Sequence, residues 1–131
     1  MILDSSAIVA ILTQEASGPR LLDAALGAAR LHISAATALE VSIVLDNRHA
    51  PQQRRRLDDL LHLLGAEVVP FDEEQWRVAR QAYQDFGRGS GHPARLNMGD
   101  CFAYALHRVT GEPLLYVGDD FSAAGVPRVT D

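Results

Sequence analysis

Lysine is absent from this chain of 131 residues, and all 12 of its basic residues are arginine. This absence argues against phosphotransfer enzymes and phospho-accepting receiver domains, which also place an aspartate after a parallel strand but keep a lysine beside the phosphate. The 17 acidic residues give a net charge of -5, so any contact with a polyanion depends on where individual arginines lie.

Cysteine is nearly absent as well. Because Cys101 is the only one, the chain can form no internal disulfide and no thiolate zinc site, and we interpret Cys101 as a small buried hydrophobic residue. No apolar run approaches the roughly 20 residues that a membrane-spanning helix needs, and Asp4 would interrupt the apolar region of a signal peptide. A cytoplasmic protein is expected. With 47% hydrophobic residues, residues 1–131 are expected to form a single domain.

The pattern of apolar residues predicts an α/β fold. Apolar segments of strand length alternate with longer segments of helical periodicity, which is typical of βα units around a parallel sheet. Strands are predicted at residues 1–4, 31–34, 67–70 and 114–117, with a further short strand at 128–130. Helices are predicted at residues 7–12, 18–29, 35–48, 51–64, 73–86 and 97–111. The helix at 35–48 is apolar nearly all round, so we expect it to be largely buried.

Acidic residues lie at the carboxyl ends of two of the predicted strands. Asp4 closes the first strand, and Asp119 and Asp120 come after the strand at 114–117. In a parallel α/β sheet, ligands bind outside the carboxyl ends of the strands. If Glu40 and Asp100 are added, these five acids account for the whole net charge, because the other 12 acidic residues balance the 12 arginines. A local acidic site is therefore predicted.

Glu40 and Asp100 each have a purely structural alternative. Glu40 lies in an apolar helix, where an unpaired carboxylate is costly unless an arginine or solvent reaches it. Asp100 lies in the first turn of a helix that Asn97 can cap, and an acid at this position often does nothing more than stabilise the helix N-terminus.

A cation would explain why such acids converge. Carboxylates brought within about 6 Å repel one another by roughly 3 kcal/mol per pair at an effective dielectric near 20. Shared protons, with raised pKa values, could offset this repulsion. Hard oxygen ligands also suit Mg²⁺ or Mn²⁺. The sequence therefore predicts a site for Mg²⁺ (or Mn²⁺).

Four segments together resemble a known family. Residues 1–7 (MILDSSA), the helix that carries Glu40, residues 96–105 (LNMGDCFAYA) and residues 114–121 (LLYVGDDF) are similar, in order and spacing, to the PIN-domain ribonuclease toxins of the VapC type. The resemblance covers essentially the whole chain. It implies a three-layer α/β/α domain with a short central parallel sheet of four or five strands. It also implies a Mg²⁺- or Mn²⁺-dependent endoribonuclease toxin, paired with a VapB-like antitoxin that binds and blocks it.

The resemblance also implies roles for individual residues. The catalytic residues would be Asp4, Glu40, Asp100 and Asp120. The metal ligands would come from Asp4, Asp100, Asp119 and Asp120. Asp120 is the better match for the fourth acid because it directly precedes an aromatic residue, and Asp119 is a neighbour that could substitute. Ser6 and Asn97 match residues that hold the first and third acids in place. Water activated by the cation would hydrolyse the RNA phosphodiester bond.

Binding surfaces are predicted more coarsely. Arg88 and Arg95 flank a glycine-rich loop just before Asp100, so they are the best candidates for contacts with RNA phosphates. The apolar helix at 35–48 and the leucine-rich helix at 51–64 offer either a homodimer face or an antitoxin groove, with the core as the alternative. The alternative function is a non-catalytic protein of the same fold that acts only by binding a protein partner.

Overall fold

The structure, a computed structural model, describes residues 1–48 and 52–130. In chain order the elements are β1 (Ile2–Leu3), α1 (Ser5–Leu12), α2 (Gly18–Gly27), β2 (His32–Ser34), α3 (Ala35–Arg48), α4 (Gln52–Leu64), β3 (Glu67–Val69), α5 (Glu73–Phe86), α6 (Met98–Thr110), β4 (Leu114–Leu115) and α7 (Asp120–Ala123). The predicted helix start at Pro51 lies outside the described residues. Within them, no helix is both long and apolar enough to cross a membrane.

The sheet is short and entirely parallel. Its four strands lie in the order β3-β2-β1-β4. The prediction of a parallel α/β sheet is confirmed. Because all strands run the same way, their carboxyl ends meet at one edge, where Asp4 follows β1 and Asp119 follows β4. The backbone N–H of Asp4 donates to the carbonyl of Leu115 at 3.1 Å, which ties the two strand ends together.

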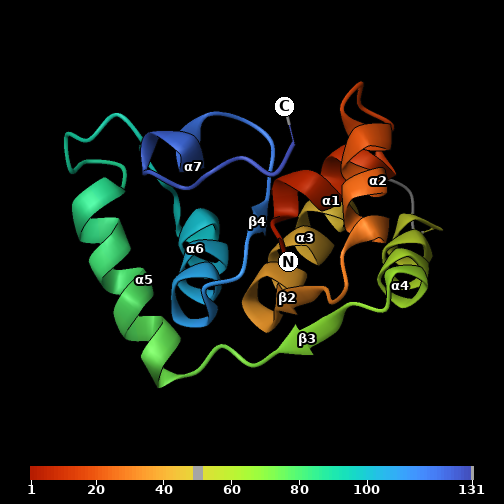
Figure 1. Ribbon diagram of the computed structural model, residues 1–131, viewed down its shortest axis with the longest axis horizontal. Helices are drawn as coiled ribbons and strands as arrows, with labels where there is room; N and C mark the ends of the chain where they lie inside the picture. The colour runs from red at the N-terminus through yellow and green to blue at the C-terminus, as the bar shows by residue number, and fades with distance from the viewer. Residues whose placement is uncertain (49–51, 131) are drawn as a thin grey trace.

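Helices cover both faces of this sheet, as Figure 1 shows, with α5 and α6 on one side of the strands and α1, α2 and α4 on the other. Successive strand residues point to opposite faces. Accordingly, Ile2 and Leu114 belong to the core under α5 and α6, whereas Leu3 and Leu115 belong to the core shared with α1, α2 and α4. The predicted three-layer α/β/α arrangement is confirmed.

The expectation that α3 is largely buried is wrong. Its residues Thr37, Val41 and Leu45 are buried, at the helical spacing of a single face. On the opposite side, Leu39 is 62% exposed and Ile43 is 50% exposed. The helix packs on the core with one stripe only, and its other apolar residues form part of the molecular surface.

The predicted strand at 128–130 is absent from the described chain, which runs there without regular structure. Side chains hold this segment instead of sheet hydrogen bonds. The Arg128 guanidinium pairs with Asp119 at 2.5 Å and lies over the Tyr116 ring, whose hydroxyl donates to the Val126 carbonyl at 2.8 Å. Pro127 has no N–H to donate to a neighbouring strand.

The leucine-rich face of α4 belongs mostly to the core. Leu57 and Leu60 are buried, and Leu61 and Leu64 are partly buried against the same cluster. Leu63 alone among these leucines is exposed, at 70%. For this helix the core alternative is therefore correct, and an interaction surface has to be sought elsewhere.

Candidate active site

Asp4 lies where β1 ends and α1 begins, and it is buried, with 1% of its surface exposed. Its Oδ2 atom accepts hydrogen bonds from the Ser6 backbone N–H at 3.0 Å and from the Ser6 hydroxyl at 2.5 Å. The Ser6 oxygen in turn accepts from the backbone N–H of Val117 at 3.0 Å. Ser6 therefore links the acid after β1 to the segment after β4. The second oxygen of Asp4, Oδ1, is buried with no hydrogen-bond partner.

Asp100 is held by the N-terminal cap of α6. Its Oδ2 atom accepts from the Asn97 backbone N–H at 2.9 Å, while the Asn97 side-chain oxygen accepts from the Asp100 backbone N–H at 2.8 Å. This reciprocal pair is a capping box. The capping role proposed as the structural alternative for Asp100 is therefore real, yet it uses only one of the two carboxylate oxygens and leaves Oδ1 available.

Glu40 reaches the same region from α3. A Cβ atom built at Gly99 would overlap the Glu40 carboxylate, so the acid occupies space that only a glycine in α6 leaves open. Glu40 Oε1 is buried without a hydrogen-bond partner. In the described residues no arginine forms an ion pair with Glu40. The arginine-paired alternative therefore fails for this part of the chain.

The electrostatics show that these acids are neighbours. Burial raises the pKa of Asp4 to about 7; the Ser6 hydrogen bonds oppose the rise, and repulsion from Asp100 and Glu40 adds to it. Burial also raises the pKa of Glu40, with a hydrogen bond from Ser5 opposing and Asp100 reinforcing the shift. Asp100 thus raises the pKa of both Asp4 and Glu40, and Glu40 raises that of Asp4, which is expected of acids that share a site.

Asp119 and Asp120, of which the sequence favours Asp120 as the fourth acid, interact with different partners. The Asp119 side chain is 94% exposed and pairs with Arg128. Asp120 starts α7 and interacts with Asp100: burial raises the pKa of Asp100, the Asn97 hydrogen bond lowers it, and Asp120 raises it further. Of the two, Asp120 is the one whose charge acts on the acidic cluster formed by Asp4, Glu40 and Asp100, through its effect on Asp100.

The donor set suits a hard divalent cation. Among residues 1–48 and 52–130, no three His, Cys, Asp or Glu side chains lie close enough together to coordinate a metal ion in their present conformations. The acids interact through space rather than by contact. However, two buried carboxylate oxygens, Asp4 Oδ1 and Glu40 Oε1, lack any protein partner, and such oxygens are the ligands that Mg²⁺ and Mn²⁺ prefer. These residues therefore fit the predicted cation.

The predicted RNA contacts differ in their relation to the cluster. Arg88 is exposed and lowers the pKa of Asp100 by its charge, so it lies within electrostatic reach of the acids. Arg95 is exposed on the same loop and adopts a left-handed backbone with φ of 51°. Cys101 is buried, and burial together with Asp100 raises its thiol pKa to about 11, which agrees with an inert structural role.

Two contributors to the site were missed by the sequence analysis. Ser5 donates a hydrogen bond to Glu40, and Gly99 provides the space that Glu40 occupies. A signal for Gly99 existed, because glycine in the first turns of a helix is unfavourable and usually has a packing reason. For Ser5 the only signal was a second hydroxyl beside Ser6.

Comparison with known proteins gives a consistent answer. A family model described as PIN domain matches residues 1–127. "Ribonuclease VapC28" of Mycobacterium tuberculosis is 50% identical over 131 residues, covering 100% of this chain and 98% of the relative. "Ribonuclease VapC" of Mycolicibacterium smegmatis is 41% identical over 129 residues, covering 98% and 99%.

Solved structures of low sequence identity share the fold. Mycobacterium tuberculosis VapC20, described as a sarcin-ricin loop cleaving toxin, aligns with a TM-score of 0.77 at 18% identity, covering 99% of this chain and 98% of that one. A toxin-antitoxin complex from Klebsiella pneumoniae aligns with a TM-score of 0.69 at 16% identity, covering 96% and 92%. The resemblance read from the sequence is confirmed, and the chain belongs to the PIN domain family as a member of the VapC type.

Proposed function

We propose that this chain is a metal-dependent endoribonuclease, the toxin of a toxin-antitoxin pair, and that residues 1–131 form one PIN-like domain acting in the cytoplasm. The observation that carries the proposal is the buried Asp4 carboxylate, with one unpartnered oxygen, beside Glu40 and Asp100 at the carboxyl edge of the sheet. Relatives that align over nearly their full length bear the name ribonuclease VapC.

In this proposal Asp4, Asp100 and Asp120 hold the Mg²⁺ or Mn²⁺ ion. When bound, such an ion lowers the pKa of water and stabilises the charge that develops on a phosphodiester. The protein's own contribution is to position the acids. Ser6 fixes one oxygen of Asp4, and the Asn97 cap fixes one oxygen of Asp100, so that in each carboxylate the other oxygen stays available.

Glu40 is the candidate proton acceptor. Its pKa is raised by burial and by Asp100, and its Oε1 atom has no protein partner. A carboxylate with a raised pKa is a better base towards water than an exposed one. We propose that Glu40 accepts a proton from the attacking water or binds the cation, and that attack leaves a 5′-phosphate and a 3′-hydroxyl. Arg88 and Arg95 would contact phosphates of the RNA next to the cluster.

Two protein partners belong to the proposal. One is a VapB-like antitoxin, which would block the site most simply by inserting an arginine or lysine among the acids in place of the cation. The other is a second copy of this chain. A groove of about 460 Å³ between α5 and α6 is lined by Trp76, Tyr83 and Met98 among others. These three side chains are 45%, 43% and 70% exposed, and a homodimer would bury them.

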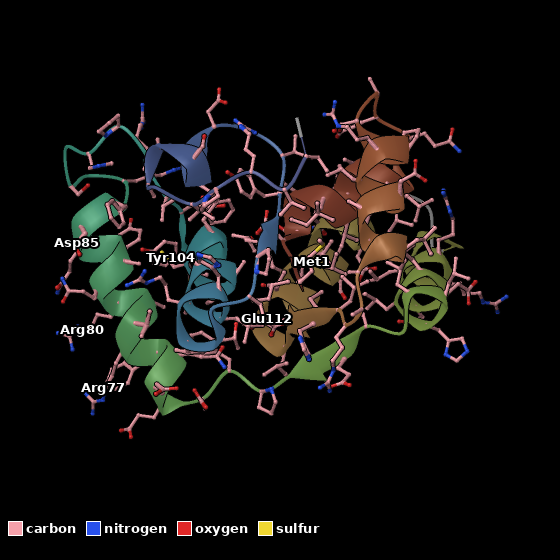
Figure 2. All side chains as sticks on the ribbon, viewed as in Figure 1. Met1, Arg77, Arg80, Asp85, Tyr104 and Glu112 are labelled. Atoms are coloured by element: carbon pink, nitrogen blue, oxygen red, sulfur yellow. The ribbon has the colours of Figure 1, made fainter. Side chains whose placement is uncertain are left out.

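The test of the function is cleavage of total RNA by the purified protein. Wild type is expected to cut RNA with Mg²⁺ or Mn²⁺ and to stop in excess EDTA. Asp100→Asn is expected to reduce the rate by at least about 100-fold, because it removes a ligand while an amide oxygen can still accept the Asn97 hydrogen bond. The matched control is Asp85→Asn, which changes an exposed acid on the outer side of α5 (Figure 2) and should cleave normally.

The same assay separates the alternative, a protein of this fold that works only by binding a partner. A binding-only domain would show equal, background-level cleavage for wild type, Asp100→Asn and Asp85→Asn. It would also show no Mn²⁺ affinity that depends on Asp4. Either result would refute the catalytic proposal.

A further inference from the structure

A small polar cavity of about 170 Å³ lies beside the acidic cluster, on the side away from α5. It is enclosed by the start of α2, the segment after β4 and the C-terminal segment. Its lining includes Ser17, Arg20, Gly118, Asp119, Arg128 and Thr130. None of the roles proposed above uses this cavity, and its lining is rich in hydrogen-bond donors.

The two arginines of the cavity are in different situations. Arg128 pairs with Asp119 and also donates to Ser122 at 3.3 Å, so its position is fixed and its charge is compensated. Arg20 is exposed and, within the described residues, forms no hydrogen bond or ion pair with another side chain. Arg20 therefore contributes an uncompensated positive charge to this cavity, and the positioned guanidinium of Arg128 adds further N–H donors.

The cavity adjoins the acidic cluster directly. Val117, which contributes to the cavity wall, donates its backbone N–H to the Ser6 oxygen, and Ser6 donates to Asp4. One side chain thus separates the cavity from the buried acid. Arg88 lies on the loop that follows α5, towards the opposite end of the molecule from α2 (Figure 1), and its charge lowers the pKa of Asp100. Positive charge is therefore present both at the start of α2 and on the loop after α5.

We propose that this cavity binds a phosphate group of the RNA backbone next to the phosphate that is cleaved, with Arg20 as its principal ligand. This inference rests on the proposed ribonuclease function. A polyanion that crosses a cluster of carboxylates needs positive charge on each side of it. Arginine is suited to the task because its planar fork donates two parallel hydrogen bonds to phosphate. The RNA backbone then runs from Arg88, over the acids, to Arg20.

The test measures RNA binding rather than cleavage. A labelled mixed-sequence RNA oligonucleotide is titrated with Asp100→Asn protein at a series of salt concentrations in the presence of Mg²⁺, so that affinity is recorded without turnover. Arg20→Ala and Arg20→Gln are then introduced on this background. The matched control is Arg30→Ala. Arg30 is an exposed arginine just before β2, at the opposite edge of the sheet, and it pairs with Glu67.

Loss of one phosphate contact should weaken binding about threefold to tenfold and reduce the slope of log affinity against log salt by roughly 0.7 to 1. Both Arg20 variants should show this change, whereas Arg30→Ala should not. If the Arg20 variants bind like Arg30→Ala, the cavity is not a phosphate site and the ribonuclease proposal is untouched. If the Asp100→Asn protein binds no RNA at all, the phosphate site is refuted, and the ribonuclease proposal is decided by the cleavage assay of wild type.

Discussion

Replacing Asp4 by asparagine should make the metal-free protein more stable at neutral pH while abolishing its activity. Asp4 is buried, its Oδ1 atom has no partner, and its pKa rises from 3.8 to about 7, first because burial disfavours the charged form. At pH 8 the folded chain therefore contains a buried carboxylate that is ionised at a cost. Asparagine keeps the shape and an oxygen for the Ser6 hydrogen bonds, and it carries no charge.

The direction in which stability changes with pH follows from proton binding to Asp4. Between pH 3.8 and about 7, the folded state holds the Asp4 proton more tightly than the unfolded state does. Stability therefore falls as pH rises through this window and levels off above it. A shift of this size corresponds to roughly 4 kcal/mol, at about 1.4 kcal/mol per pKa unit. An amide N–H₂ without a full set of partners would cost about 1–3 kcal/mol, so we expect a net gain of about 1–3 kcal/mol at pH 8.

The measurement is urea unfolding in EDTA between about pH 4 and pH 8 for wild type and Asp4→Asn. Glu40 and Asp100 also have raised pKa values and give wild type the same direction of pH dependence. The difference between the two proteins isolates Asp4. Ser6→Ala is the matched control, because it removes the hydroxyl hydrogen bond that favours the charged form and should destabilise at pH 8.

Two outcomes would contradict this prediction: a loss of stability in Asp4→Asn at pH 8, or a pH dependence identical to that of wild type. Either outcome would mean that the Asp4 carboxylate is favourably ionised in the metal-free fold. The cluster would then have no need of a cation to relieve buried negative charge. Mn²⁺ binding, measured by calorimetry, should in parallel be strong for wild type and at least about tenfold weaker for the variant.

Two further predictions concern backbone positions. Gly99→Ala should displace Glu40 and weaken Mn²⁺ binding about tenfold. Because the shorter side chain of Glu40→Asp makes room for the new methyl group, Glu40→Asp should reduce Mn²⁺ affinity less in the Gly99→Ala background than in wild type. If calorimetry showed that the two losses of affinity simply add, Gly99 would not act by leaving space for Glu40. Arg95→Gly and Gln14→Gly each relieve a left-handed backbone, with φ of 51° and 57°, and should raise the free energy of unfolding by up to about 1 kcal/mol. Only Arg95→Gly should slow RNA cleavage, and equal rates for the two variants would remove Arg95 from the RNA contacts.

Features that depend on residues close together in the chain could be predicted from the amino-acid sequence. Apolar segments of strand length and segments of helical periodicity predicted the order of strands and helices along the chain, since each pattern depends only on residues close in sequence. The capping box between Asn97 and Asp100 was readable because its partners are three residues apart. Asp4 was recognisable from its place at the end of a strand in a parallel sheet.

The remaining features could be seen only in the folded chain, because they depend on contacts between residues distant in sequence. The Glu40 carboxylate has its place only because α3 packs against α6 at Gly99. Asp119 has a different role from Asp120 because it pairs with Arg128, a contact that no local sequence pattern predicts. The same ion pair helps to hold residues 128–130 outside the sheet. Local propensity specifies which elements form, whereas packing between elements specifies which carboxylates meet.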